Sequence, residues 1–267
     1  MSGSVRAHWT LVFNGDEGLR AVVAGKTLAR LRTSAASGVS AGALARPGPI
    51  TLACIGAGYQ AWTQVEAVSR VRPIGRLLVW SRTRERAEGF AARVRDGLGL
   101  PATPVAAVAD AVAGADVVTA ATKARDPVIR GAGIRPGTHV VLAGSSHADR
   151  READTDLFAR AAAVFTDDLD LARAHSGDLR AAVADGALAW DDVRHLGAAL
   201  GGTAARPEER PDAPPEARPD PGAITVFCSH GVGSWDLELA RTALERAEAA
   251  GAGHRLDPAM GQWRDGM

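Results

Sequence analysis

The sequence predicts an α/β protein built on a parallel β-sheet with helices on both faces. From residue 50 onward, short β-prone apolar runs alternate with helical segments. That alternation is the order in which a parallel sheet is built. Several runs, such as residues 140–143, are apolar at every position, which is typical of strands buried on both faces.

The N-terminal elements differ from this pattern. Runs 8–13 and 19–23 flank a turn rich in Asn and Gly, which predicts a β-hairpin. A hairpin alone is only marginally stable in water, so we expect it to pack on another part of the chain or on a partner. Residues 26–45 have helical spacing, and the Pro-Gly-Pro sequence at 47–49 ends the helix.

The remaining elements follow in order. Strands are expected at 50–55, 76–80, 102–106, 115–120, 138–143, 162–166 and 224–228. Helices are expected at 59–71, 83–97, 107–113, 154–161, 168–174 and 234–250, with two more inside 178–200. Residues 203–222 contain six prolines and alternating charges, which predicts a mobile surface loop.

Composition narrows the class of protein. The 267 residues are 46% apolar and carry a formal net charge of zero, so a packed core is available and the basic surface of a nucleic-acid binder is missing. Cys54 and Cys228 lie in apolar runs, and we expect two buried thiols with neither a disulfide nor a metal site. Without a long apolar stretch or a signal pattern, we expect a cytoplasmic protein with no membrane or nucleic-acid partner.

A glycine-rich turn joins the strand at 50–55 to the helix at 59–71. It reads Gly56-Ala57-Gly58-Tyr59-Gln60-Ala61, and strand, turn and helix together form a dinucleotide-binding motif of the Rossmann type. Gly56 allows the tight turn, and Gly58 allows a pyrophosphate to approach the backbone. The helix N-terminus then directs N–H groups at that negative charge.

The residues after the second strand of this motif bear on the choice of cofactor. An acidic residue there would bind a free ribose 2′-hydroxyl, whereas this chain has Ser81, Arg82, Thr83 and Arg84. A hydroxyl and two cations favour a 2′-phosphate, so we predict NADP(H), with NAD(H) as the alternative.

Several segments, in order, resemble the ornithine cyclodeaminase/mu-crystallin family. They are residues 31–38, 55–61, 115–122, 126–128, 136–140, 144–152, 176–178 and 224–227. The resemblance implies a Rossmann-like cofactor domain with a small substrate and dimerisation domain built from both chain ends. It also implies a homodimer that performs pyridine-nucleotide redox chemistry at a carbon bonded to nitrogen.

The resemblance also assigns roles to residues of this chain. Arg32 matches the arginine that holds the substrate carboxylate, and Thr33 matches a residue near the cofactor phosphates. Thr122 and Lys123 follow a strand of the cofactor sheet and are further candidates for cofactor binding. His230 and Gly231 follow the last strand, where family members line the substrate pocket.

Position 146 departs from the family pattern of the cyclodeaminases. They carry an Asp there that transfers protons to and from nitrogen, whereas this chain has Ser146 followed by His147. A hydroxyl without an activating partner is a poor general base, while His147 is a candidate proton donor. The departure favours reduction of an amino-acid-derived imine, either a ketimine or a cyclic imino acid. An ornithine cyclodeaminase-type lyase with bound NAD and a non-catalytic nucleotide-binding protein are the alternatives.

The same comparison suggests three domain segments. Residues 1–45 are expected to be a remnant of the substrate domain, 46–230 the cofactor domain, and 231–267 a helix returning to the substrate domain. Family members carry a further N-terminal segment with a catalytic lysine, and neither Lys26 nor Lys123 matches it. A gene start placed too late, a pseudogene fragment and a diverged protein would each explain this.

Asp178 lies at the start of a predicted helix, and we expect it to cap that helix.

Overall fold

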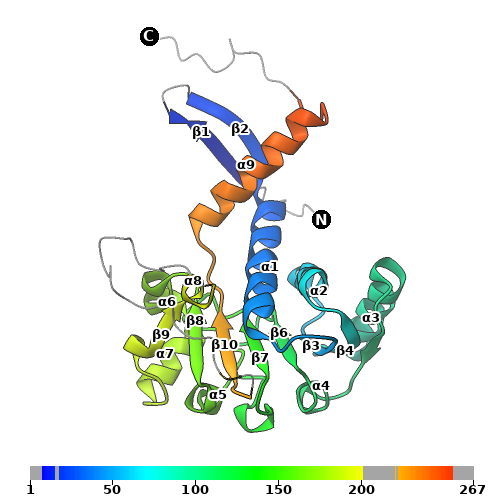
Figure 1. Ribbon diagram of the computed structural model, residues 1–267, viewed down its shortest axis with the longest axis vertical. Coiled ribbons are helices and arrows are strands. Elements are labelled where there is room, and N and C mark those ends of the chain that lie inside the picture. Colours follow the sequence, from blue (N-terminus) through cyan, green and yellow to red (C-terminus); the bar gives the residue numbers. More distant parts are fainter. Residues whose placement is uncertain (1–7, 16–17, 201–219, 221, 255–267) are drawn as a thin grey trace, which may run out of the picture. The chain divides into compact units, whose positions relative to one another are not determined.

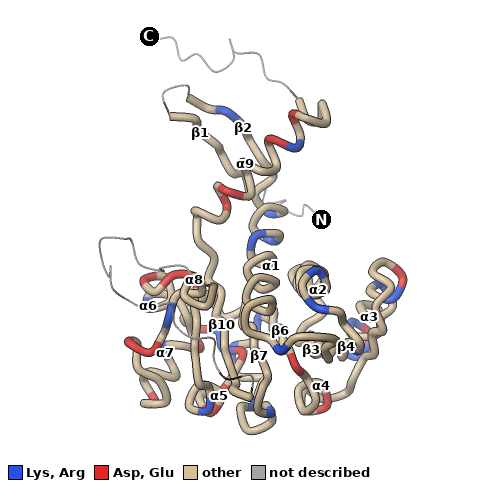
Figure 2. The backbone as a smooth tube through the Cα atoms, in the orientation of Figure 1, with Lys and Arg blue, Asp and Glu red and all other residues tan. Residues whose placement is uncertain are grey.

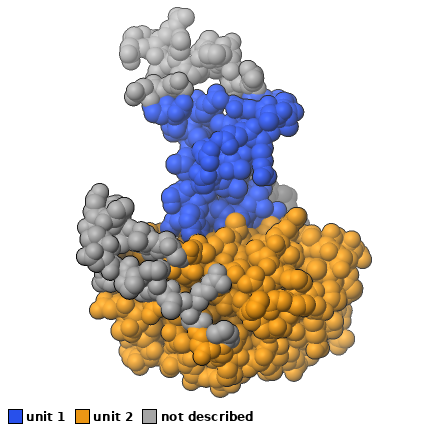
Figure 3. Space-filling model, in the orientation of Figure 1, with its two compact units in different colours: residues 1–32, 232–267 blue, residues 33–231 orange. Residues whose placement is uncertain are grey.

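The computed structural model describes residues 8–15, 18–200, 220 and 222–254. Most of the proline-rich segment 203–222 lies outside these residues. The chain forms two compact units, residues 1–32 with 232–267 and residues 33–231 (Figure 3). The helix α1 (Gly25–Leu44) contributes to both units, since the boundary falls after Arg32.

The first unit contains the predicted hairpin. Strands β1 (Trp9–Asn14) and β2 (Gly18–Ala24) pair antiparallel, and helix α9 (Gly233–Ala249) packs beside β1. Its small core joins Val12, Leu28 and Ala240. Large apolar side chains remain exposed on the hairpin, among them Trp9 (64%) and Phe13 (62%). This unit therefore presents an apolar surface as well as a core.

The second unit is built on an eight-stranded sheet in the order β5-β4-β3-β6-β7-β10-β8-β9 (Figure 1). Every pair of neighbouring strands is parallel. The strands are β3 (Ile50–Ile55), β4 (Ile74–Trp80), β5 (Ala102–Pro104), β6 (Val117–Ala120), β7 (His139–Leu142), β8 (Ala163–Thr166), β9 (Val193–His195) and β10 (Thr225–Cys228). The predicted α/β class with a doubly wound parallel sheet is confirmed.

The helices of this unit mostly lie where the sequence predicts them. They are α2 (Tyr59–Val71), α3 (Arg84–Leu98), α4 (Val108–Val112), α5 (Thr155–Arg160), α6 (Leu169–His175), α7 (Gly177–Ala184) and α8 (Leu196–Ala199), with 3-10 turns at Gly131–Gly133 and Trp190–Asp192. Strand β9 was not predicted from the sequence. It has only three residues, and its pairing with β8 rather than a local apolar run defines it.

Alternate residues of each strand pack on opposite faces of the sheet, as the two-residue period of a strand requires. Leu52 and Cys54 of β3 join one apolar cluster with residues of α2 and α3. Ala53 and Ile55 join the other, with residues of α4, α5 and α7. Burial raises the pKa of the Cys54 thiol to about 12 and that of Cys228 well above its usual value. Both cysteines are free and buried, as predicted, and both stay protonated at neutral pH.

Charges of both signs are interspersed along the described chain (Figure 2). Every helix among the described residues is too short or too polar to cross a membrane.

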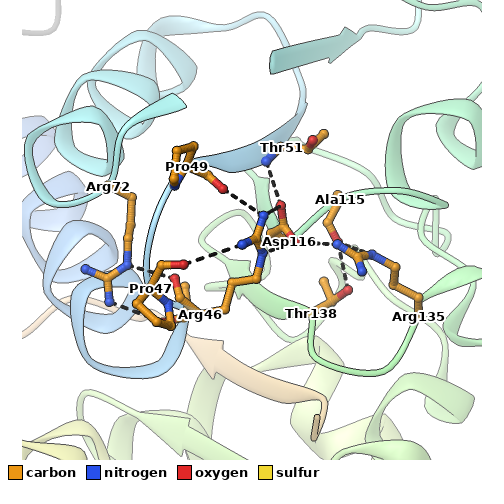
Figure 4. A network of polar contacts seen from close by, with 10 residues as sticks. Arg46, Pro47, Pro49, Thr51, Arg72, Ala115, Asp116, Arg135 and Thr138 are labelled. Atoms are coloured by element: carbon orange, nitrogen blue, oxygen red, sulfur yellow. Dashed lines mark hydrogen bonds and ion pairs between the residues drawn. The ribbon is translucent and has the colours of Figure 1, made fainter. Parts of the chain in front are cut away.

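A buried carboxylate ties the amino-terminal edge of the sheet together (Figure 4). Asp116, just before β6, accepts hydrogen bonds from Arg46 Nε at 2.6 Å and from the Thr51 amide at 2.7 Å, and it also pairs with Arg135. Burial alone would raise the pKa of Asp116. The Arg46 and Thr51 hydrogen bonds and the two positive charges outweigh that effect and hold the pKa below its usual value. The network joins the loop between α1 and β3 to the start of β6.

We expect Asp116→Asn to lower the free energy of unfolding by about 2 kcal/mol at pH 7. The change removes the negative partner of Arg46 and Arg135, whose side chains are each 44% exposed, so the cost is smaller than for a fully buried pair. Because the folded pKa is depressed, the carboxylate stabilises the fold above the pKa of unfolded Asp, about 3.9, and this contribution disappears as the pH falls through the folded value.

Urea unfolding at pH 7 and pH 3 measures both effects. The matched control is Asp149→Asn, because Asp149 pairs with Arg125 on the exposed surface at 3.2 Å and should change stability by only about 0–1 kcal/mol. Equal losses in the two variants would contradict a special role for Asp116.

Candidate functional site

The predicted residues of the cofactor sheet gather at one edge of it. In a parallel sheet all carboxyl ends lie on the same side, and ligands bind where the strand order reverses. Here the order reverses between β3 and β6. The turn at 56–60 follows β3, residues 81–84 follow β4, residues 122–123 follow β6, residues 146–147 follow β7 and residues 230–231 follow β10.

The turn after β3 has the geometry that a pyrophosphate needs. Gly56 has φ +109°, and a Cβ on it would lie 2.9 Å from the Ala121 carbonyl oxygen, so only glycine fits. A Cβ on Gly58 would meet no atom within 4 Å. Gly58 is also the N-cap of α2, and no side chain caps that helix. The first N–H groups of α2 therefore have no side-chain cap, and such a helix N-terminus favours an anionic group.

The polar residues after β4 lie on the surface. Ser81 is half-buried, while Arg82, Thr83 and Arg84 are exposed. Arg84 Nε donates to Glu88 Oε1 at 2.7 Å, one turn along α3. The structure thus places two cations at the end of β4, one of them held by a carboxylate that a ligand would have to displace or share.

A buried glutamate links the ends of β6 and β7, beside the switch point, which is the place between β3 and β6 where the strand order reverses. Glu152 Oε1 accepts hydrogen bonds from the amide and the hydroxyl of Thr122, at 2.6 and 2.7 Å, and Oε2 accepts one from the Gly144 amide at 2.6 Å. A Cβ on Gly144 would lie 2.3 Å from the Thr122 carbonyl oxygen and 2.5 Å from Glu152 Oε1. Glu152 therefore fixes the backbone from which Ser146 and Lys123 extend.

Asp178 does not cap a helix, so that prediction is wrong. Ser176 is the N-cap of α7 and accepts from the Leu179 amide at 3.2 Å. The Asp178 carboxylate instead accepts from the amides of Glu152 and Ala153, at 2.9 and 3.2 Å. The Ser176 hydroxyl, two residues earlier, occupies the capping position, so the Asp178 carboxylate is free to accept hydrogen bonds from the loop at 152–153.

Burial shifts the titration of this carboxylate pair. It raises the pKa of Glu152 to about 7, and the negative charge of Asp178 adds to the effect. Burial likewise raises the pKa of Asp178 to about 6. Near neutral pH the pair therefore holds a proton for part of the time, a property of groups close to functional sites.

The two residues at the departure from the family pattern lie in the loop after β7. Ser146 is half-buried and His147 is exposed. The His147 carbonyl accepts from the Arg150 amide at 3.0 Å, which forms a turn. Lys123, after β6, is exposed.

Arg32 belongs to the first unit and Thr33 to the second, although they are consecutive residues of α1. Within the first unit, Arg32 Nε donates to Asp236 Oδ1 of α9 at 3.0 Å. This ion pair fixes one edge of the guanidinium. Thr33 is buried.

Asp167, after β8, is a further buried carboxylate that was not predicted from the sequence. It accepts from the amides of His230 and Gly231, at 2.8 and 2.6 Å, and from the Ser229 hydroxyl at 3.1 Å. An acidic residue directly after an apolar strand was the available signal. Its neighbour Asp168 caps α6.

Comparison with known proteins shows which family has this sequence and fold. A model of the ornithine cyclodeaminase/mu-crystallin family matches residues 4–251. The chain is 39% identical over 232 residues to the Δ1-pyrroline-2-carboxylate reductase of Paracoccus denitrificans, covering 86% of this chain and 70% of the relative. It is 35% identical over 176 residues to the ketimine reductase mu-crystallin of Mus musculus, covering 66% of this chain and 55% of the relative.

A solved structure agrees with the fold. The Δ1-pyrroline-2-carboxylate reductase of Thermococcus litoralis, in complex with NADH and L-proline, superposes with a TM-score of 0.83 at 30% identity, over 92% of this chain and 73% of that one. The predicted family and the Rossmann-like fold are confirmed. The chain belongs to the ornithine cyclodeaminase/mu-crystallin family.

Proposed function

We propose that this protein is an NADP-dependent reductase of imines derived from amino acids, either ketimines or cyclic imino acids. The observation that carries the proposal is the turn after β3, where an uncapped helix N-terminus and the open space at Gly58 fit a dinucleotide pyrophosphate. Relatives named as Δ1-pyrroline-2-carboxylate and ketimine reductases support the imine as substrate.

The proposed cofactor site consists of residues at the carboxyl edge of the sheet. The backbone of Gly56, Ala57 and Gly58 and the first turn of α2, with Tyr59 and Gln60, would hold the pyrophosphate. Ser81, Arg82 and Thr83 would bind the adenosine end, and Thr33, Thr122 and Lys123 would complete the site. When bound, the reduced nicotinamide supplies a hydride.

The proposed substrate contacts depend on a carboxylate next to a C=N bond. Arg32 would bind that carboxylate, since a guanidinium matches its planar shape, and Asp236 would keep the guanidinium in place. Ser146 and His147 would lie near the substrate nitrogen. A hydroxyl at position 146 suits an imine, which gains a proton before or during reduction, better than an amine that must lose one.

NADP(H) rather than NAD(H) is the proposed cofactor because two arginines and two hydroxyls stand where a carboxylate would select NAD. Solved relatives hold NADH or NAD+, so the proposed preference for NADP(H) depends on the residues that this chain carries after β4.

We also propose a cytoplasmic homodimer. The exposed apolar side chains of β1 and β2 support a second copy as the partner, and an archaeal alanine dehydrogenase of the same fold is a dimer. Sedimentation velocity tests the oligomeric state.

The test of the activity is a panel of imines with NADPH and NADH. We expect oxidation of NADPH with Δ1-pyrroline-2-carboxylate or another cyclic or N-alkyl imino acid, and Arg32→Lys should raise KM because it removes bidentate binding. Ammonia and proline released from ornithine would instead indicate a cyclodeaminase. Absence of turnover with every imine, from protein that binds NADPH, would contradict the proposal.

A further inference from the structure

His230 and Asp167 form a buried pair at the same edge of the sheet. The amide of Ser229 donates to the Leu142 carbonyl at 2.9 Å, so the loop after β10 starts beside the end of β7. His230 Nδ1 lies 3.3 Å from Asp167 Oδ1, and the two side chains are 2% and 0% exposed. Burial alone would raise the pKa of Asp167, but hydrogen bonds from His230 and Gly231 hold it below its usual value. Asp167 is therefore ionised at neutral pH.

The hydrogen bonds around Nδ1 determine the tautomer of His230. Its two neighbours are Asp167 Oδ1 and the Thr166 hydroxyl oxygen, at 3.3 and 3.1 Å. An ionised carboxylate only accepts hydrogen bonds. The Thr166 hydroxyl donates to the Cys228 carbonyl at 3.1 Å, so toward His230 it accepts as well. Nδ1 consequently carries the proton in the neutral ring, and Nε2 is the basic nitrogen.

Nε2 itself is buried and has no hydrogen-bond partner within the part of the chain that the structure describes. Buried polar atoms in native proteins nearly always have partners, so an unpaired basic nitrogen at a ligand-binding edge requires an explanation. The other carboxylates whose charges reach this end of β10 are Glu152 and Asp178, which act with Asp167 on Cys228.

We propose that His230 is a catalytic acid whose Nε2 gives a proton to the substrate nitrogen, and that Asp167 is the positioning residue that fixes its tautomer. This proposal rests on the proposed imine reduction. The Nε2–H bond breaks as an N–H bond forms at the imine nitrogen, and the imidazolium becomes neutral. When bound, NADPH would supply the hydride to the iminium carbon, the C=N π pair would move to nitrogen, and a proton from solvent would restore the Nε2–H bond. Asp167 stays ionised throughout.

Two substitutions at His230 separate its two nitrogens. In His230→Asn the side-chain amide can keep the hydrogen bond to Asp167 but has nothing at the place of Nε2. In His230→Gln the amide can reach the place of Nε2 but cannot titrate. We expect both to lower kcat/KM for Δ1-pyrroline-2-carboxylate about 100-fold, the usual size of a general-acid contribution, with NADPH affinity within twofold of wild type.

The pH profile distinguishes a chemical role from a structural one. The wild-type kcat/KM should fall as the pH rises, because the step requires a protonated acid, and both variants should lack this fall. His195→Gln, which changes a histidine at the end of β9 on the same edge, is the matched control and should keep the wild-type profile. Wild-type kcat/KM and profile in His230→Asn would overturn the proposal.

A measurement without turnover tests the pair directly. ¹⁵N NMR of the histidine side chains should show the Nδ1–H tautomer for neutral His230, and Asp167→Asn should shift the population toward the Nε2–H form. Adding L-proline, the ligand bound by the Thermococcus litoralis relative, should move the Nε2 resonance. An Nε2–H tautomer in the wild type would overturn the proposal. If no imine is reduced, the proposed function fails, and the L-proline titration still decides whether Nε2 faces a ligand.

Discussion

Gly58→Asp is expected to lower the affinity for NADPH at least 100-fold, about 2.7 kcal/mol, and to leave the fold intact. Gly58 has φ −91° and ψ −166°, an extended conformation that aspartate adopts readily, and its Cβ would enter open space. An aspartate at this N-cap would accept hydrogen bonds from the first N–H groups of α2. Those are the groups that a pyrophosphate needs, and the carboxylate would also repel it.

The control for this variant is Gly58→Asn, which caps the helix without a charge. We expect it to bind NADPH more weakly than the wild type but more tightly than Gly58→Asp. Both variants should unfold within a few tenths of a kcal/mol of the wild type, because aspartate, asparagine and glycine are all accepted N-caps. Calorimetry with NADPH and urea unfolding provide the two numbers. Unchanged affinity in Gly58→Asp would mean that a dinucleotide, if it binds, binds elsewhere.

Gly144→Ala is expected to lower the free energy of unfolding by about 3 kcal/mol or more. The added Cβ would overlap the Thr122 carbonyl oxygen and Glu152 Oε1, at 2.3 and 2.5 Å, and neither can move without breaking the hydrogen bonds that join β6 to β7. NADPH binding should weaken as well, since the displaced backbone borders the switch point.

Gly89→Ala is the matched control and should have the opposite sign. Gly89 lies within α3, and a Cβ there meets no atom within 4 Å. Alanine in a helix interior should stabilise the protein by about 0.5–1 kcal/mol. Urea unfolding of the two variants tests the contrast. A Gly144→Ala protein as stable as the wild type would show that the Glu152 cluster is not tightly packed.

Local pattern was sufficient to predict the sheet and the cofactor turn. Apolar runs and helical spacing depend on neighbours in sequence, so β3, α2 and β4 lie within two residues of their predicted bounds. The Gly56-Ala57-Gly58 turn was equally readable, since its function depends on being between a strand and a helix.

The buried carboxylates could not be predicted in the same way. Glu152 stood inside a family motif and Asp178 looked like a helix cap, yet each is satisfied by groups far away in the sequence. Glu152 meets Thr122, 30 residues earlier, and Asp178 meets the amide of Glu152, 26 residues earlier. Asp167 meets His230, 63 residues later. Only the folded sheet brings these groups to one edge. A local sequence pattern cannot predict contacts between residues so far apart in the chain.

A calorimetric titration of the wild-type chain with NADPH and with NADH is the decisive measurement. It tests whether the carboxyl edge of the sheet, from the turn after β3 to the arginines after β4, binds a nicotinamide dinucleotide. We predict saturable binding of both, with NADPH about tenfold tighter, which corresponds to about 1.4 kcal/mol. Folded protein that binds neither coenzyme at millimolar concentration would contradict the claim, and tighter binding of NADH would contradict the role of the arginines.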